Sequence, residues 1–403
     1  MDTVITQHPA QRRILSVLVT AQILSGAGLA AGITVGALLA QDMLGATSAA
    51  GLPAALFTIG SALAAVLVAR VSGLHGRRAG LAGGYLAGAV GALGVVIAAT
   101  TDNVVLLFVA LFVYGAGSST NLQARYAGAD LASPQRRGRA VSTVLVATTL
   151  GAVLGPNLVT PTGALATSWG VPALAGPFIL AAFAYTAGAI VLWVMLRPDP
   201  LLTARSLPVD PVTTGNSSGN PRLLLIGATT MVVIQLVMIA IMTMTPVHMQ
   251  HHGHGLAATG FVIAVHVAGM FLPSPLSGWL VDRFGRLPVI AASGVTLLAA
   301  GLVGGFAPAS STPLLTVALG LLGLGWNLGL VSGTALITDA VPLESRASVQ
   351  GRIDMAIAVA GATGGMASGF VVASSSYPAL SFAGGIVALA LVPLVVVRPR
   401  VKV

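Results

Sequence analysis

Soft metal ligands are concentrated in one short stretch of the chain, residues 238–270. Five of the seven histidines and five of the eleven methionines fall there: His248, His251, His252, His254 and His266, with Met238, Met242, Met244, Met249 and Met270. Thioether sulfur and neutral imidazole nitrogen favour Cu(I) over hard cations such as Mg²⁺ and Ca²⁺. The chain has no cysteine, so Met and His are its only soft ligands.

Two of these ligand pairs have helical spacing inside apolar segments. Met238 and Met242 are four residues apart, and His266 and Met270 repeat that spacing on the next segment. Residues four apart share a helix face, and Met238 and His266 lie roughly 12 and 15 Å from the outer ends of their segments, close to the membrane midplane. We predict a buried metal site of these four residues. The alternatives are methionines that fill packing gaps, and a histidine bonded to a neighbouring carbonyl.

The turn between the two segments holds the other ligands. His248, His251, His252, His254, Met244 and Met249 form a candidate metal-capture set. The alternative is a polar turn that happens to use histidine and that Gly253 and Gly255 make flexible.

The composition identifies the kind of protein that must position these ligands. The 403 residues are 56% hydrophobic and only 7% charged, with a mean hydropathy of +0.94. Apolar runs of about 20 residues recur, which is the length of a membrane-spanning helix. We therefore predict an all-α membrane protein with twelve transmembrane helices. The expected spans are 14–41, 48–69, 79–99, 104–126, 139–160, 172–196, 223–246, 256–281, 287–307, 313–338, 347–373 and 377–397.

The spans divide into two groups of six. We expect an N-terminal tail (1–13), a six-helix bundle (14–196), a polar linker (197–222), a second bundle (223–397) and a C-terminal tail (398–403). If both termini are cytoplasmic, all nineteen Lys and Arg residues lie inside or at the inner boundary, as the positive-inside rule requires. The histidine turn then faces outward. The net charge of +9 sits in short turns, so we expect a lipid bilayer and no nucleic acid as partner.

The two halves repeat with a constant offset. Asp130 and Asp339 are 209 residues apart (339 − 130), and the same offset relates the charged turn at 73–78 to the turn at 282–287. A shared offset at two places indicates a duplicated six-helix unit.

The second of these turns carries a family motif. The segment Gly278-Trp279-Leu280-Val281-Asp282-Arg283-Phe284-Gly285-Arg286 resembles the G-x-x-x-D-R-x-G-R/K loop of the major facilitator superfamily. The resemblance implies two pseudo-symmetric bundles that rock about a central cavity, lined mainly by spans 1, 4, 7 and 10. It also implies a gating loop of Asp282, Arg283, Gly285 and Arg286, which we expect to contact the inner end of span eleven in one conformational state and to lose that contact in the other. The alternative is that these charges only set topology. The first-half copy departs from the motif, because Gly73 stands where Asp is expected.

A narrower resemblance concerns the buried ligands. M-x-x-x-M in span seven followed by H-x-x-x-M in span eight resembles the CcoA-like copper importers, whose copper supports assembly of cbb3-type cytochrome c oxidase. It implies that Met238, Met242, His266 and Met270 bind metal. Copper, free or chelated, would then be the transported substrate, and we expect no cofactor. We also expect a monomer in the bacterial cytoplasmic (inner) membrane.

Two other functions stay open. A proton-coupled exporter of drugs or small hydrophobic metabolites would need a buried carboxylate, and Asp354 in span eleven is our candidate for proton coupling. Pairing of Asp354 with Arg352 or Arg346 is the alternative reading. Asn121, Gln123, Gln235 and Asn327 would add polar atoms to the cavity-lining spans. A metal sensor or assembly partner without transport is the third possibility. No catalytic triad or phosphate loop occurs in the sequence, so we do not expect an enzyme.

Overall fold

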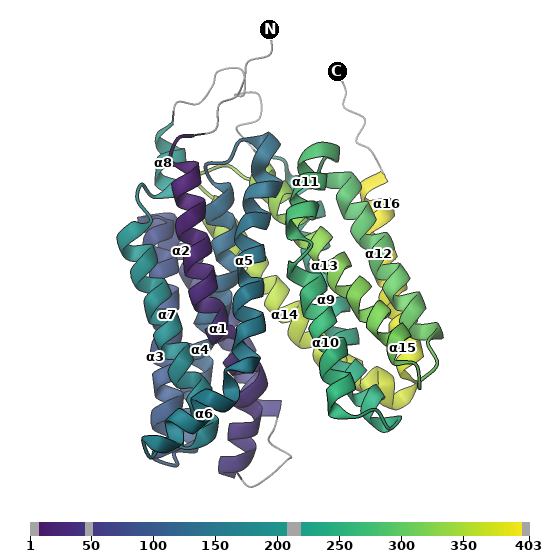
Figure 1. Cartoon of the computed structure of the whole chain (residues 1–403). Coiled ribbons are helices and arrows are strands. Elements are labelled where there is room, and N and C mark those ends of the chain that lie inside the picture. The colour runs from purple at the N-terminus through teal and green to yellow at the C-terminus, as the bar shows by residue number, and fades with distance from the viewer. Residues whose placement is uncertain (1–7, 45–50, 208–218, 397–403) are drawn as a thin grey trace. The chain divides into compact units, whose positions relative to one another are not determined.

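The computed structural model describes residues 8–44, 51–207 and 219–396, and in these ranges it is helical with no strand (Figure 1). The helices and turns of the first half are α1 (Gln11–Leu44), α2 (Gly51–His75), α3 (Arg77–Thr100), α4 (Val104–Ala129), η2 (Pro134–Arg136), α5 (Arg137–Asn157), α6 (Val159–Ser168), η3 (Ala173–Ala175), α7 (Gly176–Met195) and α8 (Pro200–Ser206). Those of the second half are α9 (Pro221–His251), α10 (Leu256–Phe271), α11 (Ser274–Phe284), α12 (Arg286–Phe306), α13 (Thr312–Ala340), α14 (Arg346–Ser374), α15 (Tyr377–Leu389) and α16 (Leu391–Val396).

A helix, or two consecutive helices, lies at every expected span within the described ranges. Ten of these segments are long and apolar enough to cross a bilayer. Many large apolar side chains face outward from the helices, such as Phe306 at 76% and Phe370 at 77% exposure. An apolar outer surface of this extent suits lipid rather than water. The prediction of an all-α membrane protein is confirmed.

The described helices form two compact units that exchange short segments of chain. Unit 1 consists of Met1–Ser133, Thr143–Ser218 and Pro342–Val359, and unit 2 of Pro134–Ser142, Gly219–Val341 and Ala360–Val403. Helix α5 therefore begins in unit 2 and continues in unit 1, while α14 begins in unit 1 and continues in unit 2. We predicted one division of the chain, at the linker, and did not predict that the starts of α5 and α14 belong to the opposite unit.

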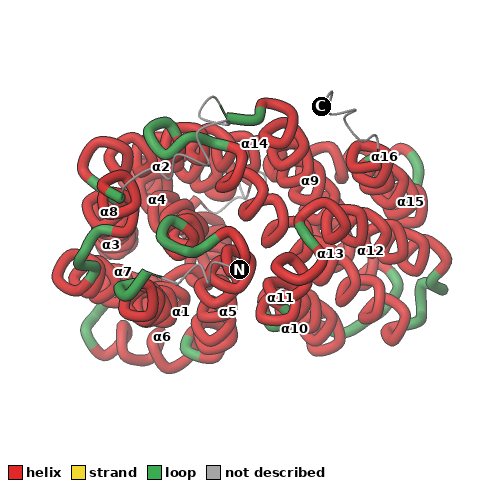
Figure 2. The backbone as a smooth tube through the Cα atoms, turned by 90° about the horizontal axis from the view of Figure 1, so that it is seen from above, coloured by secondary structure: helices red, strands yellow, loops and turns green. Residues whose placement is uncertain are grey.

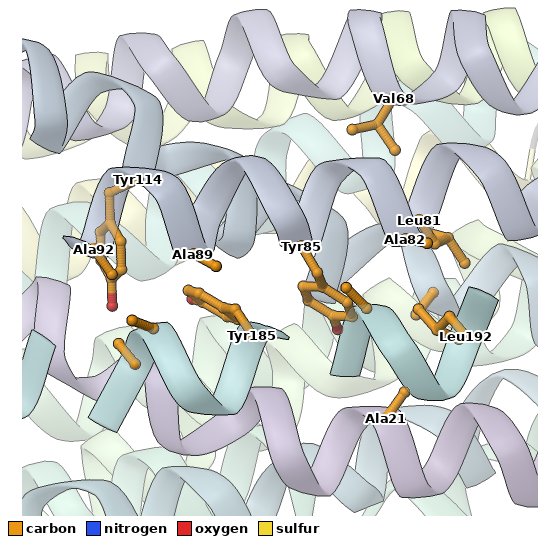
Figure 3. Packing of buried hydrophobic residues seen from close by; sticks show 14 of the residues in the cluster. Ala21, Val68, Leu81, Ala82, Tyr85, Ala89, Ala92, Tyr114, Tyr185 and Leu192 are labelled. Atoms are coloured by element: carbon orange, nitrogen blue, oxygen red, sulfur yellow. The ribbon is translucent and has the colours of Figure 1, made fainter. Parts of the chain in front are cut away.

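The core of unit 1 is aromatic. Tyr185 of α7 lies between Tyr85 of α3 and Tyr114 of α4 (Figure 3). Its ring centroid is 5.6 Å from that of Tyr85 and 5.7 Å from that of Tyr114. Glycine makes this packing possible, because a Cβ on Gly117 would lie only 2.4 Å from the Tyr185 ring. Close approach through small residues is the usual way that membrane helices pack.

In unit 2, α13 is the central helix. It packs against α9, α10 and α12, and viewed from above it lies between α9 and α10 (Figure 2). Gly269 and Gly323 allow α10 and α13 to touch, since a Cβ on Gly323 would lie 2.3 Å from the carbonyl oxygen of His266.

Span eight is interrupted between α10 and α11 at Pro273, and Asn327 of α13 fills the gap in backbone hydrogen bonding. Its Nδ2 donates to the Met270 carbonyl and to Ser274 Oγ, both at 2.7 Å, and its Oδ1 accepts from Ser277 Oγ at 2.5 Å. A break in a membrane helix is tolerated where neighbouring side chains satisfy the freed backbone groups. Asn327 therefore has a structural role in unit 2.

Candidate functional site

The same three-residue ion cluster occurs in both units. In unit 1, Arg77 Nε lies 2.8 Å from Asp130 Oδ2, and Arg346 Nη1 lies 3.8 Å from Asp130 Oδ1. In unit 2, Arg286 Nε lies 2.8 Å from Asp339 Oδ2, and Arg137 pairs with Asp339 Oδ1. The offset of 209 relates every member, since 286 − 77, 339 − 130 and 346 − 137 all equal 209. The predicted duplication thus extends to the charged contacts of the two units.

The carboxylate of Asp282 lies at the start of α5. Its Oδ1 accepts from the Gly138 backbone N–H at 2.8 Å and its Oδ2 from that of Arg139 at 3.0 Å. The first N–H groups of a helix have no intrahelical partner and carry a partial positive charge, so a carboxylate stabilises them. In this structure the carboxylate thus caps α5, and the contact that we expected with span eleven in one conformational state stays a prediction.

The remaining gating-loop residues have distinct roles. Gly285 adopts φ +94° at the junction of α11 and α12, a conformation that favours glycine, and Gly76 has φ +91° at the matching junction of the first half. Arg286 belongs to the ion cluster, while Arg283 is exposed.

Unit 1 contains a second buried ion pair. Arg125 Nη2 of α4 lies 2.7 Å from Asp354 Oδ1 of α14, and the Tyr126 hydroxyl donates to the same oxygen at 3.1 Å. Among the described residues, Asp354 Oδ2 is buried and has no hydrogen-bond partner. Our alternative reading paired Asp354 with Arg352 or Arg346, but Arg352 is exposed and Arg346 lies beside Asp130.

This second pair is not repeated at the offset of 209. At the offset of 209, the positions of Arg125, Tyr126 and Asp354 correspond to Thr334, Ala335 and Leu145. A charge inside a membrane bundle is costly and usually serves function. Because the two halves do not share the pair, it is a candidate functional site. Arg125 is one of the nineteen basic residues that the positive-inside rule assigned to the inner side or its boundary, although an ionisable residue within an apolar run was a usable signal.

The predicted metal ligands occupy helices that meet α13. His266 is fully buried, and its Nδ1 donates to the Leu319 carbonyl of α13 at 2.9 Å. This hydrogen bond is the alternative that we considered for His266. Its Nε2 is buried without a partner in the described part of the chain. Met238 is buried on α9, and Met242 and Met270 are half-buried. We expected α9 and α10 to face each other; the two helices touch, but both pack mainly against α13.

The histidine turn is organised by packing. The His248 ring stacks on Tyr377 of α15 at 4.4 Å, and His252 Nδ1 donates to the His248 carbonyl at 2.8 Å. His254 Nε2 donates to the Ala309 carbonyl at 2.8 Å, and its Nδ1 accepts from the Thr312 hydroxyl at 3.0 Å. His251 is exposed, Met244 is half-buried and Met249 is buried. The described residues contain no group of three or more His, Cys, Asp or Glu placed to hold a metal ion.

A tryptophan and a glutamine from neighbouring helices of unit 2 form a hydrogen bond beside a phenylalanine. Trp326 Nε1 of α13 donates to Gln235 Oε1 of α9 at 2.8 Å, and the Phe271 ring of α10 meets the Trp326 ring edge-on at 5.8 Å. Gln235 and Phe271 are half-buried, and Trp326 is 4% exposed. Of these three residues, sequence reasoning identified only Gln235.

Paired six-helix repeats, a charged turn that caps a helix, and buried ionisable groups define a polytopic transporter. The chain belongs to the Major Facilitator Superfamily, whose family model matches residues 18–272 and 227–403. The "Uncharacterized MFS-type transporter YdeG" of Bacillus subtilis (strain 168) is 54% identical over 97% of this chain and 93% of its own length. The "Riboflavin transporter RfnT" of Brucella anthropi is 30% identical over 98% of both chains. The solved structure of the human organic anion transporter MFSD10 matches with a TM-score of 0.74 at 15% identity, over 96% of this chain and 100% of that chain.

Proposed function

We propose that the protein moves a small planar heteroaromatic solute across the bacterial cytoplasmic membrane, with both termini cytoplasmic. The observation that carries this proposal is the Trp326–Gln235 pair beside Phe271. These residues come from spans seven, eight and ten, and spans seven and ten are expected to line the transport cavity. A flat heterocycle stacks on an indole or phenyl face, and the Gln235 amide supplies a donor for a ring carbonyl.

The relative that transports riboflavin supports this class of solute, because the flavin ring is planar and bears carbonyl and nitrogen acceptors. It is 30% identical over nearly the whole of both chains. We further propose that Asp354 carries the coupling proton, since its Oδ2 is unpartnered and its pair with Arg125 is absent from the duplicated unit.

Uptake of radiolabelled riboflavin into proteoliposomes tests the proposal. We expect the wild-type protein to transport riboflavin and Trp326→Ala to transport it at least about tenfold more slowly. Trp326→Phe should keep part of the wild-type rate, because phenylalanine retains an aromatic face for stacking. Trp169, an exposed tryptophan at the end of α6, provides the control variant Trp169→Ala. No saturable uptake of riboflavin or of other flat heterocycles by the wild-type protein would refute the proposal.

Copper import is the second candidate, and the His266 side chain favours it. A metal-ligating histidine usually donates from its other ring nitrogen to a carbonyl, as Nδ1 of His266 does to Leu319. The buried Nε2 is then free to bind Cu(I) with Met238, Met242 and Met270. Copper stoichiometry on the purified protein separates the two candidates. One bound copper that His266→Ala abolishes and His251→Ala retains would favour import of copper, and absence of binding would eliminate it.

A further inference from the structure

We propose that Arg205 of the linker helix α8 is a positioning residue that fastens the start of α14, in place of the carboxylate that is missing at Gly73. All three guanidinium nitrogens are engaged. Nη1 donates to the Gly73 carbonyl at 2.8 Å, Nε to the Leu343 carbonyl at 3.3 Å and Nη2 to the Glu344 carbonyl at 3.0 Å. One side chain thus joins the end of α2 to the turn before α14, and all these groups belong to unit 1.

The repeat identifies what Arg205 replaces. Asp282 lies in the last turn of α11 and caps the N–H groups of Gly138 and Arg139 at the start of α5. At the offset of 209, Asp282 corresponds to Gly73 in the last turn of α2, and Gly138 corresponds to Ala347 at the start of α14. A Cβ built on Gly73 would lie 3.7 Å from Ala347 Cβ. The position therefore faces the helix that a carboxylate would cap, but glycine has no group with which to cap it.

Helix α8 is anchored firmly enough to hold Arg205 in place. Leu201 and Ala204 are buried in unit 1, where α8 packs against α3 and α4. At its start, Asp199 Oδ1 accepts from the N–H groups of Leu201 and Leu202, and Asp199 Oδ2 accepts from that of Arg78 at 2.8 Å. The linker is thus tied to the first turn of α3 before Arg205 reaches across to α14.

The charge of Arg205 suits these acceptors. The carbonyl groups in the last turn of a helix lack intrahelical partners and carry partial negative charge, which a cation stabilises. Gly73 lies in the last turn of α2, which ends at His75. Arginine offers a planar set of donors that can serve several carbonyl groups at once, whereas lysine offers a single ammonium group.

Hydrogen–deuterium exchange on the full-length purified protein tests the proposal without knowledge of the substrate. We expect Arg205→Ala to speed exchange of the backbone amides at 343–350 about tenfold, with exchange in α12 unchanged. Arg205→Lys should give a smaller effect and serves if the alanine variant does not fold. Arg13→Ala, at an exposed position of α1, is the control.

The decisive variant is the double substitution Gly73→Asp with Arg205→Ala. A carboxylate at position 73 should cap the start of α14 as Asp282 caps α5, and should restore slow exchange at 343–350. Gly73→Ala with Arg205→Ala adds the same Cβ without an acceptor and should not restore it. Wild-type exchange in both Arg205 variants, or equal rescue by alanine and aspartate at position 73, would overturn the proposal.

Discussion

Arg125 and Asp354 form an ion pair of 2.7 Å between Nη2 and Oδ1, with side-chain exposures of 0% and 3%. Breaking a buried pair by removing one partner leaves the other charge without compensation, which costs about 3–5 kcal/mol. The pair joins α4 to the part of α14 that belongs to unit 1. A change in the protonation of Asp354 would therefore alter how α14 is held against α4.

We predict that Asp354→Asn abolishes accumulation driven by a pH gradient and preserves exchange of substrate across the membrane. Asparagine keeps an acceptor for Arg125 but cannot carry a proton on and off. Proteoliposomes with riboflavin as the probe allow both measurements, with and without an imposed gradient. Asp102→Asn, in an exposed loop, should behave as wild type. Gradient-driven accumulation by Asp354→Asn at the wild-type level would contradict the coupling role.

A double-substitution cycle should show that the pair is not required for folding. We expect Arg125→Met alone to lower the free energy of unfolding by about 3–5 kcal/mol, because Asp354 is left buried and unpaired. Adding Asp354→Leu, the residue found at the matching position 145, should recover most of that loss. Melting temperatures of the purified variants provide the measurement. A double variant no more stable than Arg125→Met would mean that the pair is structural.

Removal of the Asp282 side chain should weaken α5 at its start. The carboxylate accepts from two backbone N–H groups, and loss of such a cap costs about 0.5–2 kcal/mol. Asp282→Ala should lower the melting temperature more than Asp282→Asn, which retains one acceptor. Arg283→Ala, at an exposed position of the same turn, is the control. Equal melting temperatures for all three variants would exclude a capping role.

Asn327→Leu should destabilise unit 2 strongly. The substitution leaves the Met270 carbonyl without its donor, and each buried unsatisfied group costs about 1–3 kcal/mol. Asn220→Ala, which removes the side-chain cap at the start of α9, should cost only about 1 kcal/mol. Thermal unfolding of the two variants in the same detergent compares them directly. A loss for Asn327→Leu no larger than for Asn220→Ala would show that other groups satisfy the break.

His254 and His251 should differ although they are three residues apart in one turn. His254→Ala removes hydrogen bonds to Ala309 and Thr312, so exchange of the amides at 250–256 should accelerate. His251 is exposed, and His251→Ala should leave that exchange unchanged. Hydrogen–deuterium exchange across the turn measures both. Identical profiles for the two variants would mean that the His254 contacts do not order the turn.

The fold could be predicted well from the sequence because its signals are local and repeated. Apolar runs set the spans, the motif around Asp282 indicated the family, and one offset of 209 related the halves. The same offset relates the ion cluster of Asp130 to that of Asp339. Neither local composition nor hydropathy reveals these clusters. Comparison of the two halves position by position shows from the sequence alone that Arg125 and Asp354 are charged in one half only, because their counterparts are Thr334 and Leu145.

The site was harder to predict because it depends on which helices are neighbours. Consecutive spans seven and eight were expected to face each other, but α9 and α10 both pack mainly against α13, and the Leu319 carbonyl of α13 accepts a hydrogen bond from His266 Nδ1. The partner of Asp354 is 229 residues away in the chain, so no local pattern indicates it. Trp326 was missed because, in the sequence, a tryptophan in a span looks like any other packing residue. Only the structure shows that its indole N–H donates to Gln235.

The Asn327 amide has a consequence for how the protein is made. Met270 precedes Asn327 by 57 residues, so α10 and α11 leave the ribosome well before the side chain that completes their backbone hydrogen bonding. An unsatisfied carbonyl in hydrocarbon costs several kcal/mol. The interrupted span is consequently a poor candidate for independent release into lipid. We therefore expect the insertion of this span to become stable only when α13 has been synthesised and joins it in the bilayer.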